Sequence, residues 1–450
     1  MFARLLYTLA LYLAAPVVWL WMARRARRAG GQWGIFAPQR FGRYERPASV
    51  AAPVWVHAVS LGETRAAQPL VQALLERGLP VLLTHTTATG RAEGERLFHA
   101  AVAQGRLEQA WLPYDFPCAA RGFMRHYRPC RGVLIEREIW PNLLAQARAA
   151  GVPMVLASAR FSESSLRQSR WLGAAVRDAL AGLDAVLAQT DADARRLRQA
   201  GARAPQVAGN LKFDMVLPQA PLAAGRAWRK ALGRPVVAIA STREGEDALF
   251  VEAIANARAD VLFLLIPRHP QRFDEAAERL EQAGLSYVRR SAMVKGLAGG
   301  ADGQGESGGG SADAVGPGVR VMLGDTLGEM PFHYAASDVA IVAGSFAPFG
   351  GQNLIEACAA GAPVIVGPHT RNFEQAAADA IAAGAALRVP DAPSAVAAAL
   401  RLLDDPVARA AMRGAAQAWV AHHAGAVERV IAALALPDRP LPWLAGRPAR

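Results

Sequence analysis

A glutamate at the start of a predicted helix is well placed for acid–base chemistry. The segment Val54–Thr64 reads VWVHAVSLGET, an apolar run followed by a turn with Gly62 and then a helical pattern. Glu63 is therefore expected in the first turn of a helix at the carboxyl end of a strand, where ligands bind in open α/β sheets. Ser60 and Glu63 also have the spacing of a capping box, in which both side chains bond free backbone N–H groups. The two interpretations are compatible, because a carboxylate held by a cap can still accept a proton from a hydroxyl.

Three more charged groups in the same half of the chain could take part in chemistry. Glu136 and Glu138 lie in IEREIWPN, between an apolar run and a predicted helix, and a solvated strand end is the alternative interpretation. Lys212, in GNLKFD, is one of only three lysines in the chain. It could stabilise developing negative charge, or it could pair with Asp214 on the surface.

The second half of the chain carries four segments typical of nucleotide sites. Small hydroxyls, cations and glycine turns stand at successive predicted strand ends, and free backbone N–H groups there suit a phosphate. Glu356, in the predicted helix after the last segment, could accept hydrogen bonds from ribose hydroxyls. The four segments are Ala240–Glu246 (ASTREGE), Ile266–Pro270 (IPRHP), Gly324–Glu329 (GDTLGE) and Gly344–Glu356, which contains the pair Gly350-Gly351.

Several other enzyme classes are disfavoured by missing motifs. No G-x-G-x-x-G opens the first strand of either half and no P-loop motif occurs, which argues against a nicotinamide dehydrogenase and a P-loop ATPase. His85, His269 and His369 show no zinc-ligand spacing. No nucleic-acid-binding motif accounts for the formal net charge of +12, which leaves an anionic membrane surface or acidic substrates. The three cysteines are far apart, as expected in a reducing compartment.

The elements that would position these groups alternate regularly between strand and helix patterns. Short apolar runs separated by helices predict a parallel, doubly wound sheet in each half. With a carboxylate in the first half and a nucleotide in the second, this is the layout of a GT-B glycosyltransferase, two Rossmann-like domains facing across a cleft. The runs are Val54–Val59, Val81–Thr84, Val133–Ile135, Met154–Ala157, Ala185–Ala188, Val236–Ala240, Val261–Ile266, Val321–Leu323, Val339–Val342 and Val364–Val366.

The first 28 residues predict a membrane anchor. Leu5–Ala23 carries no charge and is close to the ~20 residues that span a bilayer. One arginine precedes this stretch and four follow it between residues 24 and 28, so the positive-inside rule places the rest of the chain in the cytoplasm. A buried core helix is one alternative. A helix lying in the membrane interface is another, since Pro16 interrupts the stretch.

Composition shifts predict the remaining boundaries. The first domain, for the acceptor, covers 29–216, and a Pro-containing linker covers 217–232. The second domain, for the nucleotide donor, covers 233–436 and includes a Gly/Ser-rich insertion at 296–318 that we expect to be flexible. Residues 437–450, with four prolines, read as a tail.

Nine segments, in order, resemble the 3-deoxy-D-manno-octulosonic acid (Kdo) transferases of lipopolysaccharide assembly, glycosyltransferase family 30. The similarity runs from the anchor to about residue 390. The segments are HAVSLGET, LPYDFP, IEREIWPN, GNLKFD, ASTREGE, IPRHPQRF, GDTLGEM, GSFAPFGGQNLIEA and GPHTRNFE.

The resemblance implies an inverting, metal-independent GT-B enzyme without a cofactor. Its donor would be CMP-Kdo, its acceptor the lipid A precursor (lipid IVA), its place the cytoplasmic face of the inner membrane, and its released product CMP. Glu63 matches the family's proton acceptor, and Glu138 and Lys212 match residues that stabilise the transition state. The residues that match donor-binding segments are Arg268, His269, Leu327, Gly328, Glu329, Asn353, Leu354, Ile355 and Glu356, with Ser241 and Thr242 expected at the donor phosphate or carboxylate.

Three positions depart from the family pattern. Arg137 stands where a threonine is usual, and Gln352 and Arg243 each replace a common histidine. Gln352 can still donate and accept hydrogen bonds. The alternatives to Kdo transfer are another membrane-tethered GT-B enzyme or an epimerase using a uridine nucleotide, and a membrane adaptor without catalysis. No residue indicates how many Kdo units are transferred.

Overall fold

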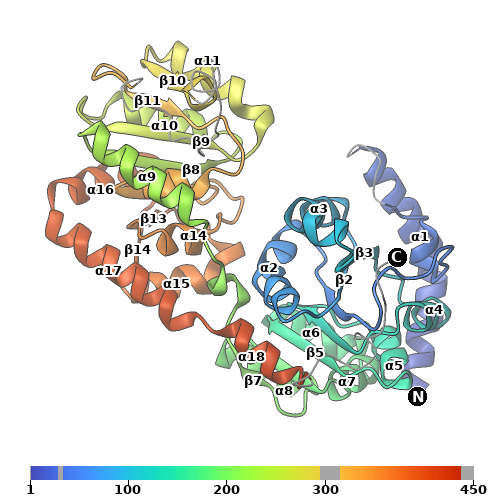
Figure 1. Cartoon of the computed structure of the whole chain (residues 1–450). Helices are drawn as coiled ribbons and strands as arrows, with labels where there is room; N and C mark the ends of the chain where they lie inside the picture. The colour runs from blue at the N-terminus through green and yellow to red at the C-terminus, as the bar shows by residue number, and fades with distance from the viewer. Residues whose placement is uncertain (1, 29–33, 294–314, 437–450) are drawn as a thin grey trace. The chain divides into compact units, whose positions relative to one another are not determined.

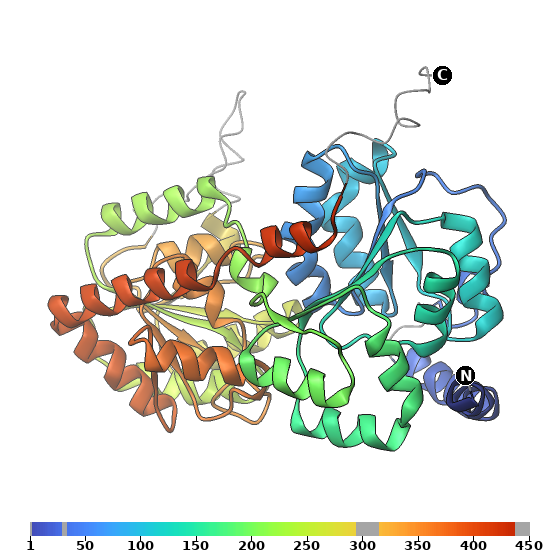
Figure 2. The same cartoon turned by 90° about the horizontal axis from the view of Figure 1, so that it is seen from below.

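Each half of the chain folds around its own parallel sheet. The computed structural model describes residues 2–28, 34–293 and 315–436. It divides into two compact units, unit 1 (Met1–Met215 with His423–Arg450) and unit 2 (Val216–His422). Each unit holds a seven-stranded parallel sheet with helices on both faces (Figures 1 and 2). The predicted α/β class with two doubly wound sheets is confirmed.

Unit 1 has the strand order β3-β2-β1-β4-β5-β6-β7. Its central strands are buried on both faces, which explains why they read as continuous apolar runs. The strands are β1 (Val54–His57), β2 (Val81–His85), β3 (Leu107–Trp111), β4 (Arg131–Ile135), β5 (Met154–Ala159), β6 (Ala185–Ala188) and β7 (Gln206–Val207). The helices are α1 (Phe2–Arg28), α2 (Leu61–Glu76), α3 (Ala88–Ala103), α4 (Pro117–Tyr127), α5 (Pro141–Ala149), α6 (Glu163–Leu172), α7 (Ala174–Ala181), α8 (Asp191–Ala200) and α18 (Ala426–Ala433), with 3-10 turns η1 (Pro38–Phe41) and η2 (Leu211–Asp214).

Unit 2 has the strand order β10-β11-β9-β8-β12-β13-β14. The strands are β8 (Val236–Thr242), β9 (Leu262–Pro267), β10 (Tyr287–Arg289), β11 (Val321–Leu323), β12 (Val339–Val342), β13 (Val364–Val366) and β14 (Ala386–Arg388). The helices are α9 (Gln219–Leu232), α10 (Glu246–Ala255), α11 (Phe273–Gln282), α13 (Met330–Ala335), α14 (Leu354–Ala359), α15 (Glu374–Ala382), α16 (Ala392–Asp404) and α17 (Pro406–His423), with 3-10 turns η3 (Pro270–Arg272) and η5 (Arg371–Phe373).

The segment expected to be a linker is mostly helix. Residues 219–232 form α9, which packs on α13 of unit 2. The approach is close, because a Cβ on Gly225 would lie 2.4 Å from the carbonyl oxygen of Phe332. Trp228 adds a ring contact with Phe332 at 5.9 Å between centroids. Most of the predicted 296–318 insertion and the whole 437–450 tail lie outside the described residues.

Helix α18 belongs to unit 1, although the sequence placed it in the second domain. Its apolar face, including Val427 and Val430, is buried in a core of the first sheet. Asp214 caps its start by accepting hydrogen bonds from the backbone of Gly425 and, at 2.6 Å, of Val427. A pattern of apolar residues identifies a helix face, but not which of two similar sheets that face covers.

Helix α1 lies along unit 1 beside α4 and α5 (Figure 1). Tyr7 donates a hydrogen bond of 2.9 Å to Asp115, and Asn142 donates one of 2.9 Å to Thr8. Trp19 packs against aromatic rings that include Phe116. Large apolar side chains elsewhere on the helix, such as Leu5, Leu9 and Leu13, are exposed, so the buried-core alternative is wrong.

The apolar part of α1 has the length of a membrane span. Among the described residues it is the single candidate span, with 23 residues from Phe2 to Arg24 and a mean hydropathy of 1.8. Only 6% of its most apolar window is buried against the protein. This supports an anchor by length and composition.

The Tyr7–Asp115 hydrogen bond should contribute measurably to the stability of unit 1. Burial raises the pKa of Asp115 to about 6. Replacing Tyr7 with Phe removes a donor from a buried carboxyl, so we expect a loss of about 1–2 kcal/mol in the free energy of unfolding. The measurement is thermal unfolding of the full chain in detergent. Tyr12→Phe is the matched control, since the Tyr12 hydroxyl reaches only Cys118 Sγ at 3.7 Å on the surface. Equal melting temperatures for both variants would contradict this role.

Candidate functional site

Glu63 is held by the predicted capping box at the start of α2. Its carboxylate accepts a hydrogen bond of 2.9 Å from the backbone N–H of Ser60. The Ser60 hydroxyl accepts one of 3.4 Å from the Glu63 backbone in return. Both halves of the box are present, and the Glu63 side chain remains partly exposed. The cap therefore fixes the carboxylate at the carboxyl end of β1.

The surroundings of Glu63 favour its protonated form. Its pKa is raised to about 7, first by burial and then by the negative charges of Glu136 and Glu138. Backbone hydrogen bonds from Ser60 and Val59 oppose the shift but are outweighed. A carboxyl with a pKa near neutrality is suited to general base catalysis.

Glu136 and Lys212 form an ion pair in the same region. Lys212 Nζ lies 3.0 Å from Glu136 Oε1, and only 21% and 13% of the two side chains is exposed. Both carboxylate oxygens of Asp214, the alternative partner of Lys212, accept backbone hydrogen bonds at the start of α18. Glu136 has a φ of 63°, which is strained for a residue other than glycine.

The turn that carries Lys212 is fixed by the strand next to β4. The backbone of Leu211 donates a hydrogen bond of 3.0 Å to the hydroxyl of Ser158. Asn210 caps the turn by accepting one of 3.0 Å from the Lys212 backbone. Ser158 itself lies in β5 with a φ of 52°. The position of the cation is therefore set by β5, through a residue that the sequence did not single out.

Glu138 completes a group of three carboxylates. Its Oε2 accepts a hydrogen bond of 2.8 Å from Trp140 Nε1 and lies 3.6 Å from His57 Nε2. Only 16% of the Glu138 side chain is exposed, so the alternative of a solvated strand end is wrong. The structure thus gathers the three predicted catalytic residues, Glu63, Glu138 and Lys212, at the carboxyl edge of the first sheet.

In unit 2, the end of β8 is strained at Ser241 and fixed by hydrogen bonds inside the protein. Ser241 has a φ of 61°, at a register shift between β8 and β9. Thr242 is fully buried and donates its hydroxyl to Asp247, which also binds Arg272. Ser241 is partly exposed, whereas the Thr242 hydroxyl expected at the donor is engaged inside the protein.

Glu246 occupies several backbone N–H groups that could otherwise bind a phosphate. This fully buried carboxylate accepts hydrogen bonds from the backbone of Arg243 at 2.8 Å, Gly344 at 2.7 Å and Phe346 at 2.9 Å. It ties the loop after β8 to the loop after β12. The sequence did not identify this role, because an acidic residue at a helix start usually signals only a cap.

The turn after β11 is fixed by an ion pair that the sequence also missed. Glu329 forms an ion pair with Arg290 at 2.8 Å and accepts a hydrogen bond from the Thr326 hydroxyl. Arg290 is fully buried and stacks 4.2 Å from the ring centroid of Phe332. Within the turn, Leu327 is 72% exposed and Gly328 has a φ of 83°. The turn therefore presents Leu327 and Gly328, while the Glu329 carboxylate holds it in place.

The other predicted donor residues stand at the ends of β9 and before α14. Arg268 and His269 are partly exposed, and burial with the charges of Arg243 and Arg268 lowers the pKa of His269. Asn353 caps α14 by accepting a hydrogen bond of 3.2 Å from the Ile355 backbone. Glu356, one turn further on, is partly exposed, whereas the side chains of Leu354 and Ile355 are buried in the core.

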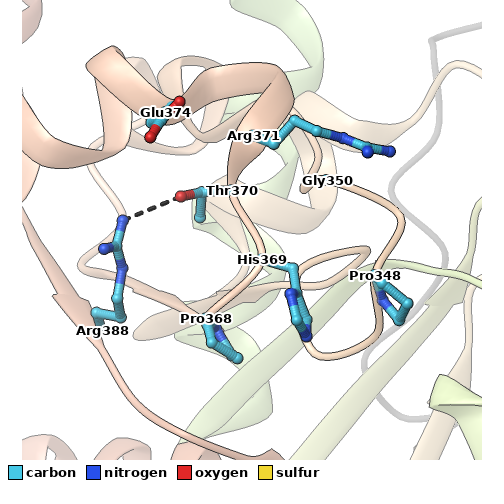
Figure 3. Close-up of a pocket in the computed structure, with 8 residues that line it drawn as sticks. All are labelled: Pro348, Gly350, Pro368, His369, Thr370, Arg371, Glu374 and Arg388. Atoms are coloured by element: carbon cyan, nitrogen blue, oxygen red, sulfur yellow. Dashed lines mark hydrogen bonds between the residues drawn. The ribbon is translucent and has the colours of Figure 1, made fainter.

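A polar pocket of about 260 Å³ opens at the same edge of the second sheet (Figure 3). It lies among the loops after β12 and β13 and the end of β14. Arg388 Nη2 donates a hydrogen bond of 3.0 Å to Thr370 Oγ1 across it. Its charged and polar lining comes from His369, Thr370, Arg371, Glu374 and Arg388, and suits an anionic group. The sequence had flagged GPHTRNFE and GSFAPFGGQNLIEA here, but not Arg388, which ends the short edge strand β14. The described residues contain no group of three or more His, Cys, Asp or Glu side chains arranged for a metal ion.

Comparison with known proteins identifies the family. The family model for 3-deoxy-D-manno-octulosonic-acid transferase (kdotransferase) matches residues 37–215, and that for glycosyl transferases group 1 matches residues 311–419. The 3-deoxy-D-manno-octulosonic acid transferase of Bordetella pertussis is 67% identical over 95% of this chain and 98% of its own length. That of Haemophilus influenzae is 29% identical over 75% of this chain and 76% of its own length.

Solved structures show the fold. UDP-GlcNAc 2-epimerase from Neisseria meningitidis bound to UDP-GlcNAc aligns over 85% of this chain and 99% of its own, with a TM-score of 0.54 and 13% identity. At this identity the likeness carries the two-sheet architecture and nothing about substrate. The identity to the Bordetella pertussis enzyme over nearly the whole length decides the matter, and the chain belongs to the 3-deoxy-D-manno-octulosonic acid (Kdo) transferase family of glycosyltransferases.

Proposed function

We propose that this protein transfers Kdo from CMP-Kdo to the lipid A precursor, with inversion, without a metal, and with release of CMP. The observation that carries the proposal is the carboxylate group around Glu63 in a chain of this family. A base with a pKa of about 7 suits deprotonation of a sugar hydroxyl at cytoplasmic pH. The exposed apolar face of α1 supports attachment to the inner membrane, where the lipid acceptor resides.

In the proposed reaction, the oxygen of the acceptor hydroxyl attacks the anomeric carbon of Kdo while Glu63 takes the proton of that hydroxyl. The bond from that carbon to the CMP phosphate breaks, and the electron pair leaves with the phosphate. Positive charge develops on the sugar ring in such a transfer. Glu138 is the carboxylate that would stabilise this charge, and its orientation is fixed by Trp140.

Lys212 would stabilise the negative charge that develops on the leaving phosphate. Its partner Glu136 holds the ammonium group in place at 3.0 Å. The strained backbone at Glu136 supports a functional role, because such strain costs on the order of 1–3 kcal/mol and persists where its surroundings enforce it.

Unit 2 would hold the donor at the carboxyl edge of its sheet. Arg268, His269 and Ser241 would bind the acidic phosphate or the Kdo carboxylate, and Asn353 and Glu356 would bind the ribose. Within the turn after β11, Leu327 and Gly328 would contact the nucleotide. Four of the residues predicted at the donor would act by shaping these loops and not by side-chain contact with the donor, namely Thr242, Glu329, Leu354 and Ile355.

Replacing Glu63 with Gln should abolish transfer while the fold is kept. Gln at this helix position still completes a capping box, so stability should change little. Loss of a general base lowers the rate on the order of 10²–10⁴-fold. The measurement is mass spectrometry of the product from CMP-Kdo and lipid IVA, with CMP binding as the check on unit 2. Glu76→Gln, at the exposed far end of α2, is the control. Normal turnover by Glu63→Gln would reduce Glu63 to a capping residue.

The pH dependence should report the raised pKa of Glu63. Because Glu63 must be ionised to accept a proton, kcat/KM should fall tenfold per pH unit below about 7. Glu136→Gln removes a negative charge that raises this pKa, so the acidic limb should move to lower pH even if the maximal rate falls. Glu76→Gln should leave the limb in place. A wild-type limb near the ordinary glutamate pKa, or no shift in Glu136→Gln, would contradict the electrostatic account.

Nucleotide competition separates Kdo transfer from use of a uridine donor. CMP should raise the thermal unfolding temperature of the protein more than UDP does at equal concentration, because binding to the folded state alone stabilises by RT ln(1 + [L]/Kd). Arg268→Ala should weaken the CMP effect. Stronger protection by UDP would favour a uridine-sugar enzyme of the same fold.

A further inference from the structure

A fully buried histidine lies behind Glu138 and has no role in the reaction as proposed so far. His57 is the last residue of β1, and its side chain has no exposed surface. β1 pairs with β2 and with β4, the strand that leads into the loop carrying Glu138. His57 therefore sits beneath the carboxylate group at the carboxyl edge of the sheet.

One ring nitrogen of His57 is fixed and the other is not. Nδ1 lies 3.1 Å from the carbonyl oxygen and 2.9 Å from the hydroxyl of Thr84. That hydroxyl in turn accepts a hydrogen bond of 2.8 Å from Trp55 Nε1. Nε2 is buried without a hydrogen-bond partner among the described residues, and it lies 3.6 Å from Glu138 Oε2.

The neighbouring hydrogen-bond donors and acceptors indicate that Nε2 carries a proton. A buried nitrogen facing a carboxylate is satisfied only if it bears a hydrogen, because a bare lone pair would face another acceptor. Thr84 permits this in two ways. Its hydroxyl can donate to Nδ1 of a neutral ring, or its carbonyl can accept from Nδ1 of a protonated ring. In both cases an N–H at Nε2 points towards Glu138.

The distance shows how little movement the contact needs. An N–H···O bond is about 3.0 Å long, so a shift of about 0.6 Å in the Glu138 carboxylate would close it. Trp140 Nε1 already holds the same oxygen, Oε2, at 2.8 Å.

The charges around Glu63 indicate what the proton on His57 Nε2 would do. Glu136 has a cationic partner in Lys212, and Glu138 has its nearest titratable partner in His57. His85 of β2 also interacts electrostatically with His57, and burial lowers the pKa of His85 to about 4, so His85 is neutral at the pH of the reaction.

We propose that His57 is the positioning residue for Glu138. It holds the carboxylate through a hydrogen bond from Nε2, and it offsets part of the negative charge that Glu138 exerts on Glu63. The kinetic part of this inference rests on the proposed transfer reaction. The presence of a proton at Nε2 does not depend on that reaction.

Two substitutions separate the ring nitrogens. His57→Asn places an amide near the position of Nδ1, so it keeps a partner for Thr84 and loses Nε2. His57→Gln places an amide N–H near the position of Nε2. We expect His57→Asn to lower kcat about 10–100-fold with little change in KM for CMP-Kdo, the range seen when an orienting partner is removed. His57→Gln should recover most of the rate, and His99→Asn, an exposed histidine on α3, is the control.

The pH profile distinguishes this role from a merely structural one. Without the proton at Nε2, Glu138 exerts its full charge on Glu63, so the acidic limb of kcat/KM should move to higher pH in His57→Asn. In a Glu138→Gln background, His57→Asn should cause no further shift and no further loss of kcat. The proposal would be overturned if His57→Asn lowered kcat equally in the wild-type and Glu138→Gln backgrounds, or if it left the acidic limb of kcat/KM in place.

Two more measurements keep the test decisive if His57→Asn does not fold or if the donor is not CMP-Kdo. Thr84→Val removes the hydroxyl that fixes Nδ1, with Thr84→Ser as control. It should lower kcat several-fold in the wild-type background only. The ¹⁵N NMR signals of the histidine rings in the full chain, assigned with Thr84→Val and His57→Gln, need no turnover. A protonated Nε2 on His57 whose signal shifts in Glu138→Gln supports the contact, and an unprotonated Nε2 overturns it.

Discussion

The crowding of three carboxylates at one sheet edge is the constraint on which the rest of unit 1 depends. Glu63, Glu136 and Glu138 repel one another in a partly buried region, and that repulsion contributes to the pKa of about 7 at Glu63. The protein tolerates it through specific partners: Lys212 for Glu136, and the indole of Trp140 for Glu138. Burial of Glu63 and, after it, the charges of Glu136 and Glu138 raise its pKa towards neutrality, although the capping box alone would favour the ionised form.

The interior of the fold was predictable from the sequence, whereas its edges were not. The apolar runs predicted ten strands, and all of them are interior strands of the two sheets. The missed strands β3, β7, β10 and β14 are the edge strands. Interior strands of a parallel sheet are buried on both faces and read as continuous apolar runs. The edge strands other than β3 are only two or three residues long, and the edge strands carry polar residues, such as Glu108 in β3 and Arg388 in β14, so their pattern resembles a loop.

The positions of Glu63 and Glu138 were predictable because each follows an apolar run at a strand end, where the ends of parallel strands meet, whereas Lys212 follows the missed strand β7 and stood out as one of three lysines. The partners of other acidic residues were not predictable. Glu246 binds a loop about 100 residues further along the chain, and Glu329 binds Arg290, which follows an edge strand. Such pairs depend on which strands are neighbours, and residue spacing does not encode that. The strained backbone at Glu136, Ser158 and Ser241 is equally invisible, because Ser and Glu give no local signal of a positive φ.

The carboxyl group of Asp115 connects the predicted membrane anchor, α1, to the start of α5, next to the segment that carries Glu138. Asp115 accepts hydrogen bonds from the backbone of Asn142 at 3.1 Å and Leu143 at 2.7 Å, which fixes the start of α5. The same side chain accepts the hydroxyl of Tyr7 in α1. α5 begins directly after the segment that carries Glu138 and Trp140. Asp115 therefore contributes to fixing both the position of α1 and the end of that segment. The helix that would anchor the protein in a membrane is thus also part of the framework around Glu138.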